Sequence, residues 1–185
     1  NLIKMTNVIS ENLKKDISFF NREDRKLINK KANKVKSILE DLNDWTINQV
    51  STIPMSKRII VSKHKALEYY GSVFGFKTIS LLDTLGESSS LRPSNISSVL
   101  AELQEDNVKV LFPEQKPVSK LLKNLSRQSS IPLADDPIFT DGLMMKGNTI
   151  SVAVHNTCII VNSFGGTCNR DLGNNLENKW NNLIK

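Results

Sequence analysis

The residues of this chain that can hold a metal ion follow the ends of its predicted strands. There are only two histidines, and one of them, His64, lies three residues past the first predicted strand. The acidic candidates follow the other three strands and are Asp83, Glu114, Asp135, Asp136 and Asp141. Because ligands of open parallel sheets bind beyond the carboxyl ends of the strands, we expect these side chains to gather at one edge. An imidazole together with carboxylates suits zinc, manganese or iron(II).

Each of these residues also has a structural interpretation, which position alone leaves open. A histidine near a helix start, as His64 is, usually lies on the surface or caps the helix. Asp141 can form an Asx turn, which loop aspartates do more often than they bind metal. Glu114 can accept hydrogen bonds from the backbone of a loop. The second histidine, His155, lies in the middle of a predicted helix and belongs to no cluster, so we expect it to be structural.

The motifs of common enzyme classes are missing from the sequence: it has no GxSxG, no HExxH, no P-loop and no GxGxxG. Gly165 and Gly166 end a predicted helix instead of opening one after a strand, so they form a poor phosphate cradle. Two histidines without an acid–base pair at fixed spacing leave little for acid–base or nucleophilic catalysis. We therefore expect a binding protein and not an enzyme.

The composition is that of an ordinary globular protein, with 39% hydrophobic and 24% charged residues. No apolar stretch is long enough to span a membrane. The first residues, Asn1–Lys4, lack the features of a signal peptide, so the sequence is either cytosolic or starts downstream of a signal. The net charge of +6 favours anionic partners or a basic neighbourhood. Basic residues cluster only over Arg25–Lys36, with few aromatic residues for base stacking, so we expect no nucleic-acid binding.

The N-terminal part of the chain is predicted to be helical. One helical face carries Leu2, Met5, Ile9 and Leu13. After a polar break, a longer helix is predicted over about Phe20–Trp45, with apolar residues at heptad-like spacing and charged residues on its other faces. A helix of about 25 residues is ~38 Å long, more than a small domain needs. We interpret it as a strut, and a coiled-coil dimer segment is the alternative.

After Pro54, strands alternate with helices. The predicted strands are Arg58–Val61, Thr78–Leu82, Val108–Phe112 and Ile131–Ala134. The predicted helices are Lys63–Phe74, Pro93–Glu105, Pro117–Gln128, Ser151–Ser163 and Leu176–Ile184, and a serine-rich loop is predicted over Glu87–Leu91. Such alternation implies βαβ units and right-handed crossovers. The predicted fold is therefore α/β: a long N-terminal helix followed by a mainly parallel four-stranded sheet with helices on both faces.

The two cysteines, Cys158 and Cys168, form no CxxC pair, which excludes a closed four-cysteine zinc site. In an oxidising compartment they can pair with each other. Two unpaired thiols are the alternative, and the spacing does not decide between them.

Four segments, in the same order along the chain, resemble the metal-binding receptors of zinc and manganese ABC transporters. Arg58–Phe76, with the sequence RIIVSKHKALEYYGSVFGF, is similar to the family's third-ligand segment. Ile96–Glu114 resembles the next helix and a strand that ends in glutamate, and Asp136–Leu143 (DPIFTDGL) resembles the loop with the last ligand. Asn1–Pro54 resembles the helical backbone between the two lobes. Arg92 departs from the family, which commonly has an acidic residue there.

The resemblance implies a metal receptor of which this chain is the C-terminal half. His64 and Asp141 would be ligands for Zn²⁺ or Mn²⁺, with Glu114 at the edge of the site. Two further histidine ligands would come from an N-terminal lobe to which nothing here corresponds. Residues 1–54 would form the interlobe backbone and residues 55–185 the C-terminal lobe, with an ABC permease as the partner. The implied location outside the cytoplasmic membrane favours a disulfide between Cys158 and Cys168.

Two other functions stay open at this point. An adhesion or partner-binding module with the same fold would keep its partner after both ligands were replaced. A basic helical module that binds nucleic acid or a partner helix through Arg25–Lys36 would show strong salt dependence. Histidine with aspartate suits both zinc and manganese, and no histidine-rich loop of the kind found in many zinc receptors is present.

Overall fold

The computed structural model describes residues 2–15, 20–82, 93–142 and 147–184. The predicted loop 87–91, Asp83 and Arg92 lie outside these residues. The chain folds as two compact units, one of Asn1–Ile47 with Arg170–Lys185 and one of Asn48–Asn169. In the part of the chain that is described, no helix is both long and apolar enough to cross a bilayer. The functional boundary proposed at residue 54 stays a prediction.

The first unit is helical and contains α1 (Leu2–Lys15), most of α2 (Arg22–Ser51) and α8 (Arg170–Ile184). The predicted apolar face of α1 is present but lies exposed: Leu2, Met5, Ile9 and Leu13 are 39–55% exposed. The N-terminus of α2 is capped by Asn21, whose Oδ1 accepts the amide hydrogens of Glu23 (2.8 Å) and Asp24 (2.9 Å).

Two helices are longer than predicted. Helix α2 continues past Trp45 to Ser51, where Gln49 and Val50 are buried, and the chain leaves the helical region at Pro54. Helix α8 begins at Arg170, although its first turns contain glycine and asparagines, which are weak helix formers.

The second unit contains a parallel sheet. Strand β1 (Ile59–Ser62) pairs with β2 (Lys77–Ser80) in parallel, with Val61 opposite Ile79. The predicted third and fourth strands join the same sheet through single parallel bridges, Val61 to Leu111 and Leu111 to Leu133. Pro113 and Pro132 flank these bridges and have no amide hydrogen, so the ladder does not extend into regular strands.

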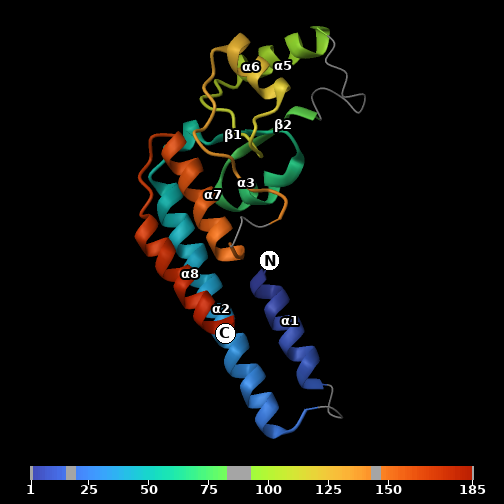
Figure 1. The fold of residues 1–185 in the computed structure, drawn as a ribbon, viewed down its shortest axis with the longest axis vertical. Coiled ribbons are helices and arrows are strands. Elements are labelled where there is room, and N and C mark those ends of the chain that lie inside the picture. The colour runs from blue at the N-terminus through green and yellow to red at the C-terminus, as the bar shows by residue number, and fades with distance from the viewer. Residues whose placement is uncertain (1, 16–19, 83–92, 143–146, 185) are drawn as a thin grey trace. The chain divides into compact units, whose positions relative to one another are not determined.

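Helices cover both faces of this sheet, which confirms the predicted α/β class (Figure 1). Neighbouring residues of β1 point to opposite faces: Ile60 lies in one apolar cluster and Val61 in the other. The Ile60 cluster includes residues of the end of α2 and of α7 (Thr149–Ser163), with side chains of α3 (Glu68–Phe74) packed against it. The Val61 cluster includes residues of α5 (Pro93–Glu105) and α6 (Lys120–Ser129).

Arg58 and two glycines hold the connection between β1 and β2 in place. Arg58 donates hydrogen bonds to the carbonyls of Val50 (3.0 Å), Ile53 (3.0 and 3.1 Å) and Phe74 (3.2 Å), which satisfies groups left over at the ends of α2 and α3. Gly75 ends α3 with φ 75°. A Cβ on Gly71 would lie 2.6 Å from a Thr78 methyl, so the glycine allows α3 to pack closely on β2.

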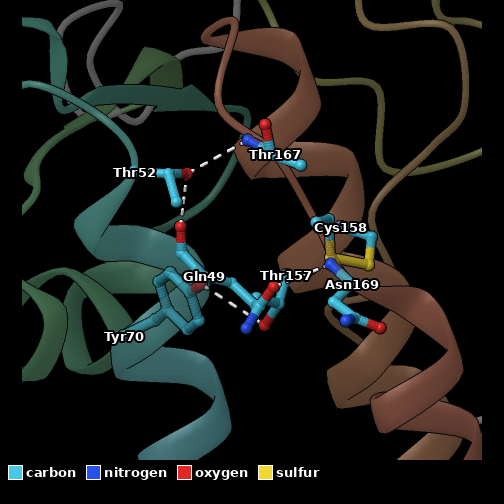
Figure 2. The surroundings of a disulfide bond; sticks show 8 residues. Gln49, Thr52, Tyr70, Thr157, Cys158, Thr167 and Asn169 are labelled. Carbon is cyan, nitrogen blue, oxygen red and sulfur yellow. Dashed lines mark hydrogen bonds between the residues drawn. A yellow bond between two sulfur atoms is a disulfide. The ribbon is translucent and has the colours of Figure 1, made fainter.

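A disulfide joins Cys158 of α7 to Cys168 in the segment that follows the helix (Figure 2). The two Cα atoms are 5.2 Å apart, and Cys158 is buried. The bond closes a short loop over the end of α7 and holds the start of the connection to α8.

The same connection is hydrogen-bonded to the end of α2, as Figure 2 shows. The Thr167 amide donates to Thr52 Oγ1 (3.1 Å), and the Asn169 amide donates to Gln49 Oε1 (2.7 Å). Gly166 makes this approach possible, because a Cβ there would lie 2.5 Å from Thr52 Oγ1. The disulfide and these bonds thus fix residues 166–169 within the second unit.

Candidate metal half-site

A pocket of about 310 Å³ opens at the carboxyl end of β1, where the sheet-edge rule places the ligands of parallel sheets. Its lining includes His64, Glu114 and Asp141, the three residues that the sequence assigned to the site. His64 and Asp141 are exposed, and Glu114 is partly buried. The structure therefore brings together side chains that are up to 77 positions apart in the sequence.

Glu114 connects the two segments that carry His64 and Asp141. Its Oε1 accepts the amide hydrogen of Lys63 at 2.6 Å and, more weakly, that of His64 at 3.4 Å. Its Oε2 accepts a hydrogen bond from the hydroxyl of Thr140 at 3.3 Å. The structural interpretation of Glu114, as an acceptor for loop backbone, thus describes its observed contacts.

The His64 segment is also held from its own strand. The hydroxyl of Ser62, the last residue of β1, donates to the His64 carbonyl at 2.8 Å. The backbone of His64 is extended (φ −116°, ψ 167°) and precedes the short helix Lys65–Leu67. His64 lines the pocket, while the backbone of the segment is hydrogen-bonded to Ser62 and Glu114.

The segment before Asp141 is fixed by two neighbouring residues of α7. Asn156 makes a two-fold contact with the backbone of Phe139: its Oδ1 accepts the amide hydrogen and its Nδ2 donates to the carbonyl, both at 2.8 Å. The buried His155 donates from Nε2 to the Pro137 carbonyl at 2.9 Å, and its ring meets the Phe139 ring edge-on. His155 is therefore placed as a structural residue, as expected.

Two of the remaining acidic candidates, Asp135 and Asp136, do not line the pocket, and Asp83 lies outside the described residues. Asp135 is exposed and outside the lining, and Asp136 forms an ion pair with Lys116. The residues that sequence reasoning missed are Ser62, Thr140 and Asn156. Of these only Asn156 left a signal, since it is an amide in the middle of a helix with buried residues on either side.

The pocket offers an incomplete set of metal ligands. Over the described ranges, no three side chains of histidine, cysteine, aspartate or glutamate are grouped so that they could hold one ion. A histidine and an aspartate in the lining of one pocket suit zinc or manganese but supply only part of a tetrahedral set of four ligands.

The parallel sheet, with helices on both faces and a pocket at the carboxyl end of β1, has the arrangement of an α/β ligand-binding lobe. Residues 1–162 match the model of the ZnuA family, described as the periplasmic component A of the zinc-uptake complex. The chain belongs to this family, which confirms the resemblance found in the sequence.

Individual relatives agree with the family match. The chain is 28% identical over 110 residues to the manganese-binding lipoprotein MntA of Halalkalibacterium halodurans, covering 60% of this chain and 36% of MntA. It is 27% identical over 153 residues to the metal-binding protein YtgA of Chlamydia pneumoniae, covering 74% of this chain and 46% of YtgA. The chain thus spans less than half the length of these two curated relatives.

Solved structures show the same fold. The periplasmic zinc-binding protein TroA from Treponema pallidum superimposes with a TM-score of 0.68 at 17% identity, covering 85% of this chain and 58% of TroA. Fe(III)-bound YtgA from Chlamydia trachomatis gives a TM-score of 0.62 at 23% identity, covering 78% of this chain and 54% of YtgA. At these identities the likeness establishes the fold alone.

Proposed function

We propose that this chain is the C-terminal half of the extracytoplasmic solute-binding component of a Zn²⁺ or Mn²⁺ ABC importer. The observation that carries the proposal is that His64 and Asp141 both line one pocket, in a chain of the zinc-uptake family. The metal ion is the transported cargo, captured between two lobes and delivered to the membrane permease.

The number of ligands supports a shared site. An ion with tetrahedral coordination needs about four ligands, and in this proposal His64 and Asp141 supply two of them. In this proposal, a preceding lobe supplies the other two, and the chain by itself holds metal weakly. The chain's short span relative to MntA and YtgA supports this division.

The chemistry of the half-site admits both metals. Zinc binds nitrogen and oxygen ligands more tightly than manganese in the usual affinity order. The relatives include manganese-binding lipoproteins and a metal ABC transporter substrate-binding lipoprotein, SloC of Streptococcus mutans. We therefore assign the cargo as zinc or manganese and leave the choice to measurement.

The location and the absence of catalysis follow from the same proposal. A disulfide between Cys158 and Cys168 is of the kind that persists in oxidising compartments, which supports a place outside the cytoplasmic membrane. Relatives named as lipoproteins support it as well. The binding role requires no chemical step, so we propose that the protein is not an enzyme.

The test is metal binding by isothermal titration calorimetry with zinc and with manganese. His64→Ala and Asp141→Ala should each weaken binding by about 10- to 100-fold or more, since even partners outside the ligand shell contribute that much. Asp135→Ala is the matched control, because it removes an exposed carboxylate of the same loop that does not line the pocket. Binding that survives both ligand replacements would contradict the receptor function and favour the adhesion or partner-binding module.

A further inference from the structure

We propose that Glu114 is a positioning residue that cross-links the two ligand segments and does not itself bind the metal. This inference rests on the proposed function, because it concerns how His64 and Asp141 are held for an ion. In this role Glu114 fixes the geometry of the site through its hydrogen bonds. Its negative charge is not required.

The carboxylate lies where it can hold both segments at once. Its contacts reach back about fifty positions to Lys63 and His64 and forward twenty-six positions to Thr140. Lys63 and His64 directly follow β1, while Thr140 immediately precedes Asp141. The Glu114 side chain therefore links the backbone at His64 to Thr140, the residue before Asp141. These two segments lie far apart in the sequence.

The contacts of Glu114 leave little capacity for coordination. A carboxylate has about four lone-pair positions, and three donors already approach this one: two amides at Oε1 and one hydroxyl at Oε2. Turning either oxygen toward an ion would break a contact that orders a ligand segment. The grouping of ligands points the same way, because the described residues contain no set of three side chains placed around one ion.

A carboxamide can make the same three contacts. The oxygen of a glutamine at this position can accept from the amides of Lys63 and His64. Its NH₂ group can donate to the hydroxyl oxygen of Thr140, which both donates and accepts. Glu114→Gln therefore keeps the cross-link and removes the charge, whereas Glu114→Ala removes both.

Asn156 makes the cross-link effective. Its two hydrogen bonds to Phe139 anchor the backbone one residue before Thr140 to α7. Because this anchor fixes Phe139, the hydrogen bond between Thr140 and Glu114 can hold the neighbouring Asp141 in a defined position. Metal-site partners outside the ligand shell act in this way in general, by fixing the orientation of the ligands.

The experiment compares Glu114→Ala, Glu114→Gln and Thr140→Val in the 185-residue chain. The first readout is zinc affinity by calorimetry. The second is amide hydrogen exchange at Lys63 and His64 by NMR, which needs no metal. Circular dichroism establishes that each variant is folded. Thr140→Ser is the matched control for Thr140→Val, because it keeps the hydroxyl.

We expect Glu114→Ala to weaken zinc binding by about 10- to 100-fold and to speed exchange of the Lys63 amide. Glu114→Gln should keep wild-type affinity and protection, and Thr140→Val should lose affinity while Thr140→Ser keeps it. The inference is overturned if Glu114→Gln loses as much affinity as Glu114→Ala, which would make the charge or direct ligation decisive. It is also overturned if Glu114→Ala leaves the Lys63 amide protected.

A failure of the proposed function looks different. In that case the wild-type chain and His64→Ala show the same zinc titration, while amide exchange still reports the cross-link. If the Lys63 amide then exchanges at the same rate in Glu114→Ala as in the wild-type chain, the cross-link is overturned as well. If it exchanges faster, the cross-link exists but serves the structure of the loops and not a metal site.

Discussion

Reduction of the disulfide between Cys158 and Cys168 should destabilise the second unit by an amount set by the loop it closes. The two residues are 10 positions apart. In the chain-entropy model, closing a loop of this size stabilises the folded state by about 2.7 kcal/mol at 25 °C, because the unfolded chain loses freedom.

The assay is urea unfolding followed by far-UV circular dichroism, with and without reductant. For a urea dependence of about 2 kcal/mol per molar, the midpoint should fall by about 1.3 M on reduction. The double variant Cys158→Ala, Cys168→Ala is the control and should not respond to reductant. An unchanged midpoint in the wild-type chain, or an equal shift in the double variant, would refute the role assigned to the disulfide.

Three further predictions concern α7, the aromatic cluster and the connection to α8. Asn156→Ala removes both hydrogen bonds to Phe139 and should lower the free energy of unfolding in urea by about 1–3 kcal/mol. It should also weaken zinc binding. A loss of stability with unchanged zinc affinity would mean that the contact with Phe139 does not position the metal ligands. Desolvation raises the pKa of Tyr70 to about 12 from its ordinary value of 10.0. The stabilising contribution of the neutral phenol is therefore complete below about pH 10 and is lost as the pH rises to about 12, and Tyr70→Phe should remove this part of the decline in melting temperature. Gly166→Ala places a Cβ 2.5 Å from Thr52 Oγ1 and should destabilise the chain by about 1–3 kcal/mol; an unchanged melting temperature would mean that the connection is looser than described.

The existence and order of the elements could be predicted from the sequence because most of them showed a clear hydrophobic period. Gly75, in the left-handed conformation, closes α3 where the sequence predicted the end of a helix. The ends that depend on packing could not be predicted. Helix α8 begins at Arg170, six residues before the predicted Leu176, although its first turns contain poor helix formers.

The sheet illustrates the same limit. Apolar runs around Leu111 and Leu133 predicted two regular strands, and both runs do lie in the parallel sheet. The prolines beside these runs limit each pairing to a single bridge, although the side chains of Leu111 and Leu133 still pack in the core. Hydrophobic pattern determines which residues are buried, whereas the length of a ladder depends on the available amide hydrogens.

The candidate site was predictable in outline because the edge of a parallel sheet is a rule of topology and not of local sequence. His64, Glu114 and Asp141 line one pocket as that rule requires. The contacts of Asn156 were not predictable, because they join α7 to a loop seventeen positions away. Such partners become visible only when the fold brings the two segments together.

The most direct test of the metal half-site uses the two histidines as each other's control. Long-range ¹H–¹⁵N NMR spectra report the ring nitrogens of His64 and His155 separately, and zinc is added stepwise to the ¹⁵N-labelled chain. His64 lies exposed on the pocket lining, whereas His155 is buried and already donates to the Pro137 carbonyl. We expect zinc to shift the His64 nitrogens alone, and the shift to disappear in Asp141→Ala at the same zinc concentration. A spectrum in which zinc leaves His64 unchanged would contradict the assignment of this pocket as a metal site.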